Sequence, residues 1–265
     1  MTIASVAVLG LGEAGSRLAA DLVAAGVHVR GYDPYVTGDV EVSVRMGDLE
    51  EAVAGCDVVL SVNAARVALD VAAAALPTLA TEALYADLNT ASPALKRELA
   101  TLVADAGRQF VDVGLLGPIP TRGLGAPAIA SGAGAQAFAD LFGPLGMPVT
   151  VVSGEAGDAA ALKLVRSVFM KGMAASAVES IQAAEAAGHA DWVRAEIAAV
   201  IGEELLERLL EGSRTHAVRR IDEMEAARDL LIELGLEPRI ASASASLLAE
   251  LAASRVPVRD RVGRQ

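Results

Sequence analysis

Short apolar runs and amphipathic segments alternate along the first 153 residues. The runs are rich in β-branched residues and have the length of buried strands, whereas the segments between them repeat their apolar residues at helical spacing. This alternation predicts an α/β fold with a doubly wound, mostly parallel sheet. The expected strands are 6–9, 27–33, 42–45, 57–62, 83–88, 109–113, 126–131 and 148–152, and the expected helices are 16–26, 48–54, one starting at 64, 93–106 and 135–142.

The pattern changes from Gly154 onward. Residues 155–187 contain no proline and predict one long helix, and further helices are expected at 191–211, 214–234 and 239–254. Glycines at 188, 212 and 235 are expected to mark the joints, and the tail from Arg255 is expected to be loose. We therefore predict an α/β domain over residues 1–153 and an all-helical domain over residues 154–265, joined by the long helix.

A glycine cluster separates the first strand from the first helix. Gly10, Gly12 and Gly15 have the spacing G-x-G-x-x-G, which permits a tight turn, a close approach to a pyrophosphate and close helix packing. The free N–H groups at the start of the helix would bind the pyrophosphate. The motif predicts a Rossmann-like dinucleotide site whose loop consists of Gly10, Leu11, Gly12, Glu13, Ala14 and Gly15.

The second strand ends at Asp33, before Pro34. Asp33 lies 21 residues beyond Gly12, close to the spacing of about 20 at which a carboxylate binds the adenosine ribose hydroxyls. The alternative is a turn-forming Asp-Pro pair. A carboxylate there would repel a 2′-phosphate, and no arginine follows it closely in the sequence, so we expect NAD(P) as the cofactor, with NAD favoured over NADP.

Residues at the carboxyl ends of later strands are further candidates, because such residues line the ligand crevice of a doubly wound sheet. Val62, Asn63 and Asn89 occupy such positions. Asn63 is either a helix N-cap or a contact on the nicotinamide side. Ser92 is expected to cap the helix that begins at Pro93.

Composition and charge exclude several classes of protein. No apolar run reaches the roughly 18 residues of a membrane span. A net charge of −12 argues against binding to nucleic acid or an anionic membrane. Cys56 is the only cysteine, so no intrachain disulfide can form and a cytoplasmic location is expected. The sequence has no His/Cys cluster that would predict a metal site and no G-x-S-x-G elbow.

The first part of the long helix carries polar residues among apolar neighbours. Lys163, Ser167 and Lys171 are spaced four residues apart and share one helix face. Burial lowers the pKa of a lysine and suits it to proton transfer near neutral pH. The alternative is a pair of lysines that extend from a packed helix to solvent.

Four sequence blocks together resemble the β-hydroxyacid dehydrogenases, which include 3-hydroxyisobutyrate and 6-phosphogluconate dehydrogenases. The blocks occur in the order and at the spacing typical of that family, over about the first two-thirds of the chain. They are Gly10-Leu-Gly12-Glu-Ala-Gly15, Asp87-Leu-Asn89-Thr90-Ala-Ser-Pro93, Val111-Asp112-Val-Gly-Leu-Leu-Gly117 and Gly157-Asp-Ala-Ala-Ala-Leu-Lys163-Leu-Val-Arg-Ser167.

The resemblance implies that Lys163, six residues after Gly157, is the catalytic proton donor and acceptor. It implies that Asn89, Thr90, Gly117, Ser167 and Lys171 line the substrate side. The chain departs from the family pattern in three places: Ala159 replaces a glycine, Ser167 replaces an asparagine, and Leu116-Gly117-Pro118 replaces Ser-Gly-Gly. These departures are compatible with the reaction type and leave the identity of the substrate open.

The C-terminal third resembles short phosphogluconate-dehydrogenase-like proteins whose helical domain has no assigned function. His216, Arg219, Arg220 and Glu223 lie at helical spacing there. Either His216 and an arginine bind an anionic substrate group, or Arg219 and Glu223 form an ordinary ion pair. The resemblance implies a homodimer in which the partner subunit completes the site.

The sequence therefore predicts an NAD(P)-dependent oxidoreductase that acts on a small, anionic hydroxy-acid-like substrate. Two alternatives remain open: an enzyme that reduces C=N bonds, and a non-catalytic protein that binds NAD.

Overall fold

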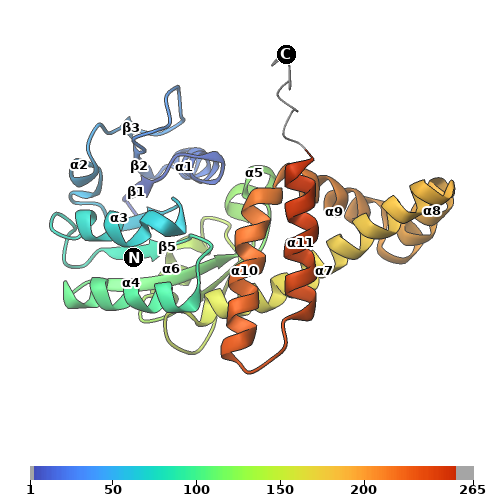
Figure 1. The fold of residues 1–265 in the computed structure, drawn as a ribbon. Coiled ribbons are helices and arrows are strands. Elements are labelled where there is room, and N and C mark those ends of the chain that lie inside the picture. Colours follow the sequence, from blue (N-terminus) through green and yellow to red (C-terminus); the bar gives the residue numbers. More distant parts are fainter. Residues whose placement is uncertain (1–2, 255–265) are drawn as a thin grey trace, which may run out of the picture. The chain divides into compact units, whose positions relative to one another are not determined.

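The computed structural model describes residues 3–254, which divide into two compact units: one up to Lys163 and one from Leu164. Within these residues the first unit contains an eight-stranded sheet in the order β3-β2-β1-β4-β5-β6-β7-β8 (Figure 1). The strands are β1 (Ser5–Leu9), β2 (His28–Tyr32), β3 (Val44–Arg45), β4 (Val58–Ser61), β5 (Leu84–Asp87), β6 (Gln109–Leu115), β7 (Ala128–Ser131) and β8 (Val149–Val151).

All neighbouring strands are parallel except β6 and β7. Between those two strands lie only α5 (Ile119–Arg122) and a 3-10 turn, η2 (Gly123–Gly125), in place of a long crossover helix. The predicted doubly wound, mostly parallel sheet is confirmed.

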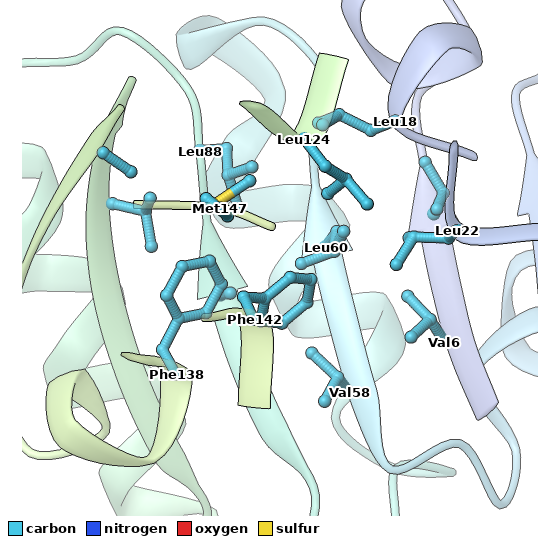
Figure 2. Close-up of a cluster of buried hydrophobic side chains, with 14 of the residues drawn as sticks. Val6, Leu18, Leu22, Val58, Leu60, Leu88, Leu124, Phe138, Phe142 and Met147 are labelled. Carbon is cyan, nitrogen blue, oxygen red and sulfur yellow. The ribbon is translucent and has the colours of Figure 1, made fainter. Parts of the chain in front are cut away.

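Helices cover both faces of this sheet, because alternate residues of each strand point to opposite sides. Val6 and Val8 pack with Leu18 of α1 (Glu13–Ala24) on one face, while Ala7 and Leu9 belong to a second core cluster on the other. Figure 2 shows the first cluster, in which Phe138 and Phe142 of α6 (Ala135–Phe142) stack with their ring centroids 4.3 Å apart. The second face is covered by α2 (Leu49–Val53), α3 (Ala68–Ala75), which follows the 3-10 turn η1 (Ala65–Val67), and α4 (Pro93–Asp105).

The long helix expected from the sequence is α7 (Asp158–Ala187), which runs from the first unit into the second. The sequence prediction sets the domain limit at 153/154, whereas the division into compact units falls at 163/164, inside α7. The physical reason is that the first turn of α7 is bonded to the sheet, as described below.

The second unit is helical throughout its described part. After α7 come α8 (Ala190–Ile201), α9 (Glu203–Thr215), α10 (Ala217–Glu233) and α11 (Arg239–Ala253). Its core joins Val178 and Ile181 of α7 to Leu206 and Leu210 of α9, and α10 and α11 pack against each other. The expectation for the tail from Arg255 lies outside the described residues.

One joint between the helices was predicted at the wrong place. The expected single helix 191–211 is broken at Gly202, whose φ of +85° is a backbone conformation that other residues rarely adopt. The expected joint at Gly212 is instead inside α9, and the chain turns at His216. Among the described residues, no helix is long and apolar enough to span a bilayer.

Candidate functional site

The glycine loop between β1 and α1 has the geometry that its spacing predicts. Gly10 has a φ of +104°, and a Cβ there would lie 2.5 Å from the carbonyl oxygen of Val62. A Cβ on Gly15 would lie 1.8 Å from the carbonyl oxygen of Gly10, so α1 packs directly against the loop. Beside Gly12, in contrast, a Cβ would have no atom within 4 Å.

The start of α1 is therefore open on the side where a ligand would approach. Gly12 is the N-cap residue and offers no side-chain cap, and Glu13 and Ala14 follow with their N–H groups at the positive end of the helix. An uncapped helix start beside an open glycine is the arrangement that receives a pyrophosphate.

Asp33, at the end of β2, bonds to this loop through one carboxylate oxygen and to its own turn through the other. Oδ2 accepts a hydrogen bond from the N–H of Leu11 (2.8 Å), and Oδ1 accepts from the N–H groups of Tyr35 (2.8 Å) and Val36 (3.1 Å). Burial alone would raise the pKa of Asp33, but these N–H donors and the nearby Arg45 hold the pKa below its usual value. The turn-forming role is thus present, and the carboxylate stays ionised near neutral pH.

An arginine that is distant in sequence lies beside Asp33. Arg45 of β3 donates to the carbonyl oxygens of Asp33 (3.1 Å) and Val36. Arg45 lies twelve residues beyond Asp33 in the sequence and so does not follow it closely. The register of β3 against β2, with Arg45 opposite Gly31, brings the guanidinium there.

The polar residues at the ends of β4 and β5 form a connected cluster. Asn89 Nδ2 lies within hydrogen-bond distance of Ser61 Oγ (3.2 Å), Asn63 Oδ1 (3.0 Å) and Asp87 Oδ1 (2.5 Å), which share its two amide protons. Asn63 donates in turn to Ser61 Oγ and caps no helix, since the next N-cap is Ala64. The cluster therefore fixes both asparagines, and Val62 lies beside them at the end of β4.

Lys163 lies in the same unit as this cluster and contacts Thr90, the residue that follows Asn89 in the sequence. Its Nζ donates to the hydroxyl of Thr90 at 2.8 Å, so two candidates 73 positions apart in the sequence meet. Lys163 is half-buried and Thr90 is exposed. Ser92 caps α4 by accepting from the N–H of Leu95, and Pro93 is in its first turn, as predicted.

The first turn of α7 is bonded to the sheet by two buried side chains. Asp112 of β6 accepts from the N–H groups of Gly157 (3.1 Å) and Ala160 (2.9 Å), and Ser131 of β7 accepts from that of Ala159 (2.9 Å). These bonds fix the helix whose next turn carries Lys163. The N–H of Ala159, the residue that replaces the family's second glycine, is thus already bonded.

Gly117 lies in the loop between β6 and α5. A Cβ there would make ordinary contacts with Ala126, Arg122 and Pro127 at 3.5–3.6 Å. The loop is held to the start of β7 by a hydrogen bond from the N–H of Leu116 to the carbonyl oxygen of Pro127 (2.8 Å).

Ser167 and Lys171 lie in the second unit and contact an acid of α10. The hydroxyl of Ser167 and the ammonium of Lys171 both donate to Glu223 Oε1, the latter at 3.0 Å. The pKa of Lys171 is lowered, mainly because the side chain is buried. Glu223 raises this pKa, whereas the positive charges of Arg220 and Arg166 lower it further. Ser167 and Lys171 are therefore both held by Glu223.

Arg220 is the arginine of α10 that joins this cluster. Its guanidinium donates to Ser213 Oγ (3.0 Å) and lies over Gly212, where a Cβ would be 2.3 Å from Nη2. His216 forms the junction of α9 and α10 and is half-buried. Within residues 3–254, no three His, Cys, Asp or Glu side chains are grouped to hold a metal ion.

Sequence reasoning missed Lys96, which lies on α4 and is buried with Asp87 and Asp112. In the sequence, Asp87 and Asp112 stand out only as members of two of the family's sequence blocks. An acid inside an otherwise apolar strand needs a partner, and this signal could have identified Asp112.

Two family models match this chain, one within each of its two compact units. The model of the NAD binding domain of 6-phosphogluconate dehydrogenase matches residues 5–154. The chain belongs to this family. Within the second unit, a domain of unknown function (DUF1932) matches residues 184–251. The predicted family resemblance is confirmed by the NAD-binding family domain.

Solved structures share the fold over nearly the whole chain. A conserved protein of unknown function, described as structurally similar to 3-hydroxyacid dehydrogenases, is 28% identical, with a TM-score of 0.72 over 95% of this chain and 98% of its own. A Mycobacterium tuberculosis 3-hydroxyisobutyrate dehydrogenase with L-serine is 22% identical, with a TM-score of 0.79 over 95% and 94%. An imine reductase from Myxococcus stipitatus in complex with NAD+ is 18% identical, with a TM-score of 0.67 over 96% and 95%.

The residues of the first unit fit the dinucleotide that its family binds. The open space at Gly12 and the uncapped start of α1 would receive the pyrophosphate. Asp33 is at the strand end where the adenosine ribose binds in such folds. At the end of β5, Asn89 Oδ1 is buried and has no hydrogen-bond partner within residues 3–254.

Proposed function

We propose that this protein is an NAD(P)-dependent oxidoreductase of the β-hydroxyacid dehydrogenase type, with Lys163 as its general acid and base. The observation that carries the proposal is the hydrogen bond of 2.8 Å between Lys163 Nζ and Thr90 Oγ1. It brings an amine on α7 to the residue that directly follows Asn89, on the cofactor side of the sheet. A purely NAD-binding protein has no need of that pair.

The proposed roles follow from the chemistry of the side chains. Bound nicotinamide would supply or accept the hydride at the carbinol carbon. Lys163 would take the hydroxyl proton when the C–O bond becomes a carbonyl, and would return it in the reverse direction. Thr90 would orient the amine, and the bonds of Asp112 and Ser131 to the first turn of α7 would hold the helix in place.

We propose a small anionic substrate. Arg220, Arg166 and Glu223 all lie near Lys171 in the second unit. The three cations outnumber the one acid there, in a protein of net charge −12. Ser167 and His216 are further candidates of this unit, and Gly117 is a candidate in the first.

We propose NAD as the preferred cofactor. Asp33 is ionised near neutral pH and would repel a 2′-phosphate. The guanidinium of Arg45 nearby would favour NADP, but it donates to the carbonyl oxygens of Asp33 and Val36.

The test is turnover by Lys163→Ala on a panel of short hydroxy acids, phosphorylated hydroxy acids and cyclic imines, followed by nicotinamide absorbance. We expect kcat on the best hydroxy acid to fall roughly 10²–10⁴-fold, as for loss of a general acid/base. The dissociation constant for NADH should stay unchanged. Glu179→Ala, at an exposed position of α7, is the control.

Unchanged turnover in Lys163→Ala would remove the proposed role. The panel also separates the alternatives: activity confined to imines would favour C=N reduction, the activity of the imine reductases that share this fold. Tight NADH binding without turnover of any compound would favour a non-catalytic role.

A further inference from the structure

A row of polar residues crosses the interior of the sheet in the first unit. Ser61, Asp87, Asp112 and Ser131 are register partners on β4, β5, β6 and β7, and all four are fully buried. Two carboxylates on adjacent strands inside a sheet are unfavourable unless a cation lies between them, because water cannot solvate them there.

Lys96 provides that cation. Its side chain is 1% exposed, and Nζ lies 2.7 Å from Asp87 Oδ2 and 2.9 Å from Asp112 Oδ1. It also donates to the carbonyl oxygen of Asp87 (2.8 Å), so the ammonium contacts three oxygens. Burial would lower the pKa of Lys96, but Asp87 and Asp112 raise it, so the amine is charged.

Each acid holds an element of the cofactor side through its other oxygen. Asp87 Oδ1 accepts from Asn89, which also donates to Asn63. Asp112 Oδ2 accepts from the N–H groups of Gly157 and Ala160 at the start of α7. One ammonium thus connects the asparagines at the strand ends with the helix that carries Lys163.

We propose that Lys96 is a positioning residue of the cofactor site. By neutralising Asp87 and Asp112 together, it holds the pair Asn63–Asn89 and the first turn of α7 in one arrangement. The role at Asn63 and Asn89 rests on the dinucleotide site of the family. The role at α7 rests on the proposed function, in which α7 carries the general acid and base.

Removal of the ammonium makes the site sensitive to pH. Asp87 and Asp112 would then face each other without a cation, and one of them would bind a proton, because two adjacent buried carboxylates cannot both ionise. Binding of that proton relieves the repulsion between the two carboxylates, so the variant should be more stable at low pH than at high pH.

The experiment measures NADH affinity by fluorescence, and Tm, for Lys96→Met at about pH 6 and pH 8. We expect Tm to fall by about 10 °C, since loss of one partner of a buried ion network is strongly destabilising. NADH affinity should fall roughly tenfold at the higher pH and less at the lower, a difference that the wild type does not show. Wild-type NADH affinity at both pH values would overturn the proposal.

The matched variant is Lys96→Met combined with Asp87→Asn. It removes one charge together with the cation, and the amide oxygen can still accept from Asn89. We expect this double variant to regain most of the Tm and the NADH affinity. If Lys96→Met alone does not fold, a folded double variant that binds NADH supports the proposal, whereas a double variant that is unfolded or binds weakly overturns it.

Failure of the proposed function would look different. Lys163→Ala with undiminished turnover would refute the role of Lys163 and leave the NADH results for Lys96 unaffected. Loss of turnover in Lys163→Ala together with wild-type NADH binding in Lys96→Met would refute only the positioning role.

Discussion

Asp33 joins two segments of the cofactor site through its two carboxylate oxygens. Oδ2 binds the glycine loop at Leu11, and Oδ1 organises the turn at Tyr35 and Val36. Oδ2 retains acceptor capacity for a ribose hydroxyl, since an ionised carboxylate offers about four lone-pair sites and the three N–H groups occupy only one of those on Oδ2. At this scale one acid serves the loop, the turn and, as we propose, the choice of cofactor.

Substitution of Asp33 tests the cofactor preference. For Asp33→Ser we expect NADH affinity to fall roughly 10- to 100-fold, the value of hydrogen bonds to a charged group. The ratio of NADPH to NADH affinity should rise, because the charge that repels the 2′-phosphate is gone. Both dissociation constants can be measured by fluorescence titration.

Asp39→Ser is the control, since Asp39 is an exposed acid of the same segment and its loss changes the net charge equally. Equal ratios of the two dissociation constants in Asp33→Ser and in the wild type would contradict the assignment.

Helix breaks in the second unit depend on backbone geometry more than on the presence of a glycine. Gly202 and Gly212 lie ten residues apart, yet only Gly202 has a positive φ. Gly212 continues α9 and leaves room for the guanidinium of Arg220. Both glycines look alike in the sequence, because the neighbour that decides between them comes from α10.

The break at Gly202 can be tested by Gly202→Ala. With φ at +85° and ψ at 143°, this residue occupies a region that is nearly restricted to glycine, and alanine should cost about 1–3 kcal/mol there. For a protein of this size we expect Tm to fall by roughly 2–10 °C.

Gly47→Ala is the matched control for this substitution. Gly47 lacks a positive φ, and an added Cβ would have no atom within 4 Å. A thermal melt of the two variants should therefore separate them, and an equal or higher Tm in Gly202→Ala would show that the chain does not require this conformation.

For the whole molecule, we propose the homodimer that the family resemblance implies. Several large apolar side chains of the second unit are exposed, among them Phe169 (69%), Trp192 (67%) and Val200 (84%). Such exposed residues can form contacts between copies of the chain.

Sedimentation equilibrium provides the test. We expect twice the chain mass for the wild type, and a shift toward monomer for Phe169→Glu, because a buried charge would oppose association. Tyr35→Glu, at an 89% exposed position of the first unit, should remain dimeric. A wild-type protein that is monomeric at all concentrations would contradict the proposal.

The sequence by itself determined the alternating α/β fold, the glycine loop, the cap at Ser92 and the long helix. These depend on local patterns: the two-residue period of strands, the helical period, and backbone demands that only a few residue types meet.

Tertiary structure alone decided the partners of the buried charges. Lys96 meets Asp87 and Asp112, and Glu223 meets Lys171, in each case across two different elements. Local spacing carries no information about such pairs, because strand order and helix packing determine which side chains share a buried environment. The contact of Lys163 with Thr90 was decided in the same way.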